Sequence, residues 1–279
     1  MSISKAGATE REVWRDGVRA RDAVAVEEPL EIRAAGDTLA ITLRTPGDDA
    51  RLAAGFLFAE GIIRSLDELS SLAHCGRPGD EAYGNVVDAR PSGGVVLAIE
   101  RAQASRRGTL TTAACGLCGR QSVDDLLERC LPLPDGPRIP RAVLLASAAR
   151  LGEKQALFAQ TGGTHAAAAF DAQGELLAAH EDVGRHNAVD KVVGALLYAG
   201  LVGSKVKPEV KRPALLVVSS RAGFEVVQKA TMARIPVVAS LGAASSLAID
   251  LASRANVTLA AFVRGERFNL YSRPERVGP

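Results

Sequence analysis

The sequence LVVSSRAG, residues 216–223, decides the fold class of the second half of this chain. Its apolar start is typical of a buried strand, and its small polar centre is typical of a tight turn. Its end leads into a helix that we predict over residues 224–233. VASLGAAS, residues 238–245, repeats the same order one unit later. Two successive strand–turn–helix units predict a layered α/β fold with partly parallel strands.

The sequence around these two units continues the alternation of strands and helices. Residues 164–170 and 176–180 flank a turn and predict a hairpin. Apolar periodicity predicts the remaining elements, which are strands over 214–219, 237–240 and 257–263 and helices over 141–159, 186–198 and 245–255. We therefore expect residues 137–279 to form one layered α/β domain.

The first half of the chain has a different texture. Residues 29–32 and 38–44 predict a strand pair, residues 50–60 a helix, and residues 85–89 and 94–99 further strands, which is an α+β pattern. The stretch LPLPDGP, residues 131–137, contains three prolines, which exclude both a helix and a central strand. We therefore predict a linker there, preceded by an N-terminal α+β domain over residues 1–136.

Composition limits the class of protein. The chain has 279 residues, of which 47% are hydrophobic and 24% charged, as in ordinary soluble proteins of one or two domains. Its 34 basic and 32 acidic residues give a net charge of +2, so no nucleic-acid partner is expected. No apolar run approaches the roughly 18–20 residues of a membrane span, and residues 1–17 lack a signal-peptide core. We expect a cytoplasmic protein, in which paired cysteines are more often catalytic or metal-binding than structural.

The most reactive chemistry is expected at CGLCGR, residues 115–120, which holds two of the four cysteines. Ser122 to Asp125 reads as a capping box that opens a helix through about Cys130. The positive end of a helix and the neighbouring Arg106, Arg107 and Arg120 favour thiolate over thiol. Cys115 and Cys118 are therefore predicted to present reactive sulfur.

Two other uses of these cysteines remain open. A zinc site needs four ligands, and His74, Cys75 and Cys130 are the remaining candidates, although Cys75 is better explained as a buried core cysteine. A thiol–disulfide oxidoreductase usually carries its CxxC at the strand-to-helix start of a βαβ unit, which the basic, small-residue stretch 101–114 does not predict.

A second polar cluster is EDVGRHNAVDK, residues 181–191. On the predicted helix, His186 and Asp190 share one face at a spacing of four residues. The cluster could supply a base, an arginine and asparagine that grip a ligand, or a metal site, and the alternative is a charged helix start with local ion pairs. TGGTH, residues 161–165, either lets the backbone approach a ligand or simply starts a strand.

The turns at residues 219–223 and 241–245 offer a phosphate site. Parallel strands bring such turns together at one edge of the sheet, where free N–H groups at helix starts bind phosphate, and Arg221 could assist. The alternative is that any strand-to-helix turn needs small residues and a cap.

Taken in order, these motifs resemble the formate dehydrogenase accessory sulfurtransferase family, which are sulfur carriers in molybdenum cofactor maturation. The resemblance covers nearly the whole chain, and one departure is Ser220, where the family tends to have glycine. The motifs that carry it lie at residues 28–30, 44–49, 55–57, 60–61, 115–119, 161–165, 181–191, 224–229 and 262–267.

The resemblance implies a sulfur relay. A cysteine desulfurase would hand sulfane sulfur to Cys115 as a persulfide, with Cys118 as its partner. The substrate would be the molybdenum (or tungsten) bis(guanine dinucleotide) cofactor, sulfurated before insertion into the catalytic subunit of formate dehydrogenase. The resemblance also implies a homodimer, a cytidine-deaminase-like second domain and no permanently bound metal. Because the deaminase zinc motifs are not found in the sequence, that kinship would concern the fold alone.

The cofactor-binding residues expected from the resemblance and from the turns are mostly arginines and their neighbours. They are Arg185, His186, Asn187, Ser219, Arg221, Phe262, Val263, Arg264, Gly265, Glu266 and Arg267. The main alternative function is a non-enzymatic cofactor chaperone in which the CxxC only clamps a metal ion.

Overall fold

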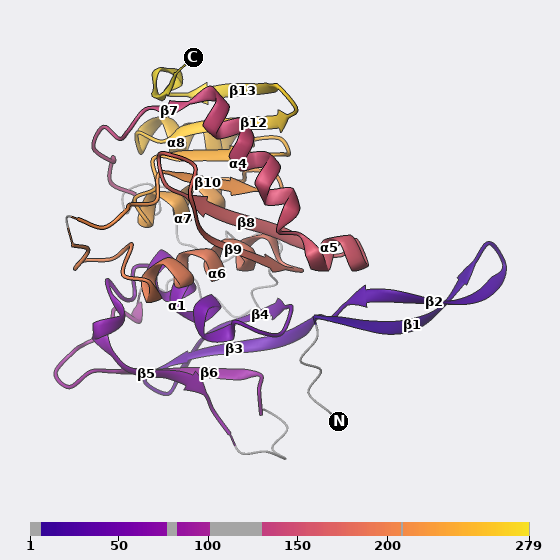
Figure 1. The fold of residues 1–279 in the computed structure, drawn as a ribbon. Helices are drawn as coiled ribbons and strands as arrows, with labels where there is room; N and C mark the ends of the chain where they lie inside the picture. The colour runs from indigo at the N-terminus through magenta and orange to yellow at the C-terminus, as the bar shows by residue number, and fades with distance from the viewer. Residues whose placement is uncertain (1–6, 77–82, 101–129, 208, 279) are drawn as a thin grey trace.

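The computed structural model describes residues 7–76, 83–100, 130–207 and 209–278 (Figure 1). The predicted reactive cysteines Cys115 and Cys118, and the helix predicted from residue 122 onward, lie outside these described residues. Within the described part of the chain, no helix is both long enough and apolar enough to cross a membrane.

A six-stranded sheet forms the larger layer, in the order β13-β12-β11-β10-β8-β9. Strands β10, β11 and β12 are parallel, and the other neighbours are antiparallel. This confirms the predicted α/β layering with partly parallel strands. The strands are β8 (His165–Phe170), β9 (Leu176–Asp182), β10 (Leu215–Val218), β11 (Val237–Ser240), β12 (Thr258–Arg264) and β13 (Arg267–Ser272).

Alternating side chains of this sheet feed two separate cores, as the two-residue period of a strand requires. Leu216 and Val218 of β10 pack with helices on one face, whereas Leu215 and Val217 pack with α4 on the other. The helices are α4 (Arg141–Glu153), α5 (Ala156–Thr161), α6 (Arg185–Tyr198), α7 (Phe224–Met232) and α8 (Ser246–Arg254).

The N-terminal part forms a four-stranded sheet in the order β4-β3-β6-β5, with helix α1 (Asp49–Ala59) against it. In Figure 1, α1 and α6 lie between the two sheets, and one apolar core runs from Ile32 through Leu57 and Val193 to Val218. The α+β class of this part is therefore confirmed. Its strands are β3 (Glu28–Ala34), β4 (Asp37–Arg44), β5 (Leu69–His74) and β6 (Val86–Pro91), with the 3-10 turn η1 (Leu66–Glu68) before β5.

Several predicted elements differ from the structure. The strand predicted over residues 94–99 is absent, because Gly94 has a φ of +78° and the chain turns there with Val95 N donating to the Ser92 carbonyl. The helix predicted over 141–159 is broken at Lys154 into α4 and α5. Leu133 of the predicted linker is buried and donates its N–H to the carbonyl of Ala255 at the end of α8, so this segment is packed against the second half of the chain. The division into two domains at residue 136 stays a prediction.

The N-terminal hairpin was not predicted. Strands β1 (Ala8–Arg15) and β2 (Val18–Ala25) extend away from the body, with α5 over their root (Figure 1). Their charged residues, which pair across the two strands as in Arg15–Asp22, leave no continuous apolar face for periodicity to detect. The remaining short elements are β7 (Ile139–Pro140), η2 (Pro274–Arg276) and β14 (Val277–Gly278), and β7 and β14 pair with each other.

Helices α1 and α6 pack backbone against backbone. A Cβ atom on Gly55 of α1 would lie 1.9 Å from the carbonyl oxygen of Asp190, and a Cβ on Gly194 of α6 would lie 1.9 Å from the carbonyl oxygen of Arg51. No side chain can be accommodated at such distances without moving one helix. The two glycines therefore determine how closely the N-terminal sheet approaches the second half of the chain.

Replacing Gly55 tests this contact. We expect Gly55→Ala to lower the free energy of unfolding by about 3 kcal/mol or more, because the methyl group meets backbone rather than a movable side chain. The control is Gly152→Ala in α4, where an added Cβ meets nothing within 4 Å. We expect that variant to be neutral or more stable by roughly 0.4–1 kcal/mol. Urea unfolding followed by circular dichroism measures both, and equal stability of the two variants would contradict the close contact.

Candidate functional site

The two strand-to-helix turns that follow β10 and β11 lie side by side, as the sequence predicts. Ala222 and Ala244 form a parallel bridge, Ala222 N donates to the Ala243 carbonyl at 2.9 Å, and Ser245 N donates to the Ala222 carbonyl at 3.1 Å. The turns thus form one continuous edge at the carboxyl ends of the parallel strands, where α/β proteins commonly bind ligands.

A cavity of about 430 Å³ opens at this edge, within the size range of small-molecule sites. Among the described residues, three of the predicted site residues line it, namely Arg185, His186 and Arg221. The other described residues in its lining are Ala222, Gly223, Phe224, Glu225, Ala243, Ala244, Ser245 and Leu247. The site therefore combines an apolar wall with two arginines and a histidine.

The starts of α6, α7 and α8 surround this cavity. Ser245 caps α8 by accepting a hydrogen bond from Ala248 N, whereas Gly184 and Gly223 begin α6 and α7 without any side-chain cap. Uncapped helix starts present backbone N–H groups and a partial positive charge. With Arg185 and Arg221 beside them, these helix starts make the cavity suited to an anionic ligand such as a phosphate.

His186 is held in place by a residue that the sequence analysis did not select. Its Nδ1 lies 2.6 Å from Oε2 of Glu225, and both side chains are almost buried, with exposed fractions of 13% and 9%. One helical turn further on, Lys229 Nζ donates to Asp190 Oδ1 at 2.6 Å, and both side chains are buried. The signal for Glu225 was present in the sequence, because Glu225 and Lys229 repeat the four-residue spacing of His186 and Asp190.

Burial and the neighbouring charges together set the protonation of the deeper pair. Burial raises the pKa of Asp190 to about 6, against the opposing charge of Lys229. Burial also lowers the pKa of Lys229, but the negative charges of Asp190, Glu60 and Glu225 outweigh it and leave that pKa above its ordinary value. We therefore infer that the pair is ionised near neutral pH, and that each charge depends on its partner.

Asn187 and Ser219 have structural bonds in this fold. The side-chain amide of Asn187 donates to the Leu43 carbonyl at 2.7 Å and to Asp182 Oδ1 at 3.0 Å. Ser219 Oγ accepts a hydrogen bond from Ala166 N on the neighbouring strand β8. The structure thus places both residues behind the cavity, where they connect elements of the fold.

The predicted segment 262–267 forms the β12–β13 turn next to the cavity. Phe262 N donates to the Gly242 carbonyl at 2.9 Å, and a Cβ on Gly242 would lie 3.0 Å from Arg221 N. Gly242 therefore lies between Phe262 and Arg221. Val263 is buried, and Gly265 turns the chain with a φ of +55°. Every member of the segment except Val263 is exposed, including the charged Arg264, Glu266 and Arg267. The Glu266 carbonyl accepts a hydrogen bond from Arg141. The cofactor-binding roles of all these residues stay predictions.

His165 extends the cluster from β8. Burial lowers its pKa, and the nearby positive charges of Arg185 and His186 lower it further. The histidine of the TGGTH motif therefore lies close enough to the first turn of α6 for their charges to interact.

The remaining cysteines do not assemble a metal site within the described ranges. Cys130 is buried, whereas Cys75, expected in the core, is only half-buried because it follows the exposed edge strand β5. No group of three or more potential ligands (His, Cys, Asp or Glu) is close enough there to hold a metal ion.

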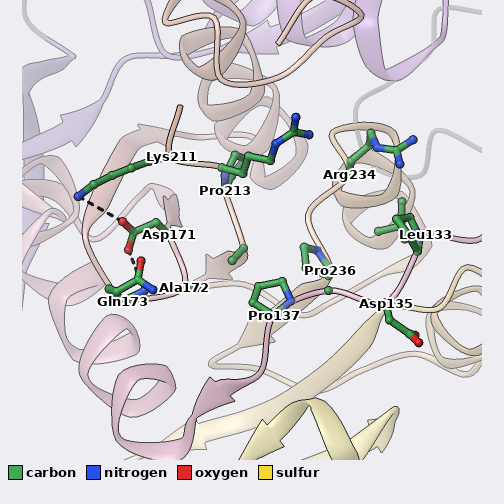
Figure 2. Close-up of a pocket in the computed structure, with 14 residues that line it drawn as sticks. Leu133, Asp135, Pro137, Asp171, Ala172, Gln173, Lys211, Pro213, Arg234 and Pro236 are labelled. Carbon is green, nitrogen blue, oxygen red and sulfur yellow. Dashed lines mark hydrogen bonds and ion pairs between the residues drawn. The ribbon is translucent and has the colours of Figure 1, made fainter. Parts of the chain in front are cut away.

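A second cavity, of about 390 Å³, lies at the amino ends of β10 and β11 (Figure 2). Residues 133–137, which follow the cysteine-bearing segment in the chain, form one wall, and Arg212 and Arg234 also line it. Its buried carboxylate, Asp171, is already 3.5 Å from Lys211 Nζ. No helix of the described chain starts at this cavity, which leaves the cavity at the carboxyl ends of the strands as the candidate functional site.

Comparison with known proteins places the chain in a class of accessory proteins. A protein from Desulfotalea psychrophila, whose crystal structure is described as that of a formate dehydrogenase accessory protein, matches 97% of this chain and 98% of its own length, with a TM-score of 0.71 and 26% identity. The sulfur carrier protein FdhD of Anaeromyxobacter dehalogenans strain 2CP-C is 56% identical over 278 residues, which are 99% of this chain and 96% of that protein. The protein of the same name from Streptomyces avermitilis is 46% identical over 262 residues, covering 92% and 89% of the two chains.

Residues 25–278 match the FdhD/NarQ family. The chain belongs to this family, and the resemblance drawn from its motifs is confirmed.

The buried pair between α6 and α7 allows a stability test. We expect Asp190→Leu and Lys229→Met each to lower the free energy of unfolding by about 3–5 kcal/mol, because each leaves a buried charge without its partner. The double variant removes both charges and is expected to lose much less than the sum of the two. Chemical unfolding of the four proteins measures the coupling, and strictly additive losses would contradict a paired buried charge.

His165 predicts a dependence of stability on pH. Because its pKa is lower in the folded chain than the ordinary 6.5, the unfolded chain takes up a proton first as the pH falls. The contribution of His165 to stability is therefore present above pH 6.5 and lost as the pH falls below it. As the pH falls from about 8 to 5.5, we expect the free energy of unfolding to decrease less in His165→Gln than in the wild type. Parallel curves of the free energy of unfolding against pH would contradict the assignment of this effect to His165.

Proposed function

We propose that this protein is a sulfur carrier that sulfurates the molybdenum (or tungsten) bis(guanine dinucleotide) cofactor for formate dehydrogenase. Membership of the FdhD/NarQ family and relatives named sulfur carrier proteins support the sulfur-transfer role. The single structural observation that favours a nucleotide-bearing substrate is the cavity that three helix starts surround, with Arg185, His186 and Arg221 in its lining.

In this proposal Cys115 receives the sulfur. Its thiolate attacks the outer sulfur of a persulfide on a cysteine desulfurase, a new S–S bond forms on Cys115, and the desulfurase cysteine leaves as thiolate. The exchange consumes no oxidant or reductant. Cys118 can then attack Cys115 and release hydrosulfide for the metal of the substrate, which leaves a disulfide that a cellular dithiol must reduce.

The cofactor is the substrate, and the residues around the cavity would hold its nucleotide part. Arginine forms paired hydrogen bonds with phosphate oxygens, and helix starts add backbone donors, so Arg185, Arg221 and the starts of α6 and α7 would bind phosphate groups. The apolar wall near Phe224 and Leu247 would exclude water from a flat ring. The exposed Arg264 and Arg267 of the neighbouring turn would meet the more distant parts of a long ligand.

The proposal extends to partners and location. A sulfur donor and a cofactor acceptor are both required by the chemistry, which makes a cysteine desulfurase and the catalytic subunit of formate dehydrogenase the expected partners. We also propose a homodimer and a cytoplasmic location, where reduced thiols persist.

Intact-mass analysis after incubation with a cysteine desulfurase and cysteine tests the carrier role. We expect the wild type to gain one sulfur atom, which reduction removes, and Cys115→Ala to gain none. Cys75→Ala is the control, since it removes a half-buried thiol elsewhere and should behave as wild type. The Cys118→Ala variant should gain sulfur and retain it longer. No gain in any protein would reject the persulfide mechanism and favour a cofactor chaperone that only binds its ligand.

A further inference from the structure

Four ionisable side chains join helices α6 and α7 behind the candidate cavity. His186 and Asp190 lie one turn apart on α6, and Glu225 and Lys229 lie one turn apart on α7. Each residue pairs with the residue opposite, His186 with Glu225 and Asp190 with Lys229, both at 2.6 Å. Acidic and basic groups thus alternate around the cluster, so each acidic side chain lies next to a basic one.

Only one of the two pairs reaches the cavity. His186 and Glu225 line it, whereas Asp190 and Lys229 are absent from its lining and buried. Glu225 is also near enough to Lys229 for its negative charge to help raise the pKa of that lysine, after the larger effects of burial, Asp190 and Glu60. The Glu225 carboxylate is therefore held between two basic groups and has little freedom to leave His186.

The bond to Glu225 decides which imidazole atom a ligand can meet. A hydrogen bond from Nδ1 to a carboxylate fixes the orientation of the ring. Nε2 is not used by this bond, and it donates when the ring carries protons on both nitrogens. Because His186 stands in the first turn of α6 beside Arg185, that donor would add to the groups that favour an anion.

We propose that Glu225 is a positioning residue for phosphate recognition, which holds His186 by Nδ1 so that Nε2–H donates to a phosphate oxygen of the bound nucleotide. This inference rests on the proposed function for the nature of the ligand. It assigns to Glu225 a role that acts through His186, and it predicts selectivity for phosphorylated over unphosphorylated guanine ligands.

Binding of GDP and of guanosine to the full chain tests the inference. GDP contains a nucleotide part like that of the proposed substrate, and guanosine lacks its phosphates. We expect Glu225→Ala to weaken GDP binding about tenfold and to leave guanosine binding unchanged, because only a phosphate contact is lost. Glu225→Gln keeps an oxygen that can accept from Nδ1, and it should restore part of the GDP affinity. Arg212→Ala, in the second cavity, is the control and should bind GDP as wild type does.

Nitrogen-15 spectra of histidine-labelled protein provide a readout that a merely structural role would not change. The chain has four histidines, so the His186 signals can be assigned by comparison with a His186→Asn variant. GDP should shift the Nε2 signal of His186 in the wild type, and this shift should be lost in Glu225→Ala. If Glu225→Ala fails to fold, the Glu225→Gln protein decides, through an altered Nδ1 signal and a reduced GDP-to-guanosine affinity ratio.

The outcomes separate this inference from the function on which it rests. A wild type that binds neither GDP nor guanosine would reject the proposed nucleotide site, and the role of Glu225 with it. A wild type that binds GDP, with an unchanged affinity ratio in both Glu225 variants and no shift of His186 Nε2, would overturn the positioning role alone. A loss of thermal stability without any change in that ratio would likewise identify Glu225 as structural only.

Discussion

The contact between helices α1 and α6 controls the arrangement of both sheets. Gly55 and Gly194 let each helix touch the backbone of the other, and a single methyl group at either position would overlap a carbonyl oxygen. Because α1 covers the N-terminal sheet and α6 covers the second sheet, the separation of these helices sets the separation of the two layers. The apolar core can run continuously from Ile32 to Val218 only because the two helices approach this closely.

Polar groups fix the direction of approach that the glycines permit. Lys191 of α6 donates to the Thr45 carbonyl at 2.9 Å and pairs with Asp182 at 2.7 Å, and Asp182 in turn accepts from Thr45 N at 3.2 Å. At the same junction, the buried Arg44 forms two hydrogen bonds with Asp49 at the start of α1. Apolar packing alone would tolerate sliding of the helices, whereas these directional bonds tie the β4–α1 turn to the end of β9 and to Lys191 of α6.

The candidate site inherits its geometry from this junction. The first turn of α6 carries Arg185 and His186 into the cavity, and its orientation depends on α1 below it and on α7 beside it. The cavity thus joins residues from three separated stretches of the chain, near residues 185, 221 and 244. The buried charges of Asp190 and Lys229 lower stability unless each has its partner. Together they help to hold His186 and Glu225 in one arrangement at the cavity. This arrangement suits a phosphate-bearing ligand.

Local patterns in the sequence were sufficient for most elements of the second half, and for the family. Apolar runs such as residues 215–218 predict strands, turns of small residues predict helix starts, and the ordered motifs identify the family, because each of these depends on neighbours in sequence. The same reasoning failed where neighbours in sequence do not determine the secondary structure. The hairpin β1–β2 has no apolar face, and residues 94–99 have strand-like composition but no partner strand among the residues that the structure describes. Only the tertiary structure brought Glu225 to His186 and gave Asn187 a structural role, because both depend on contacts between segments that sequence spacing does not relate. The sequence by itself therefore determined most of the elements and the family, whereas the reactivity of Cys115 and Cys118 stays a prediction. The packing of α6 against α1 and α7 decided which residues form the cavity, since burial and pairing are properties of the assembled chain.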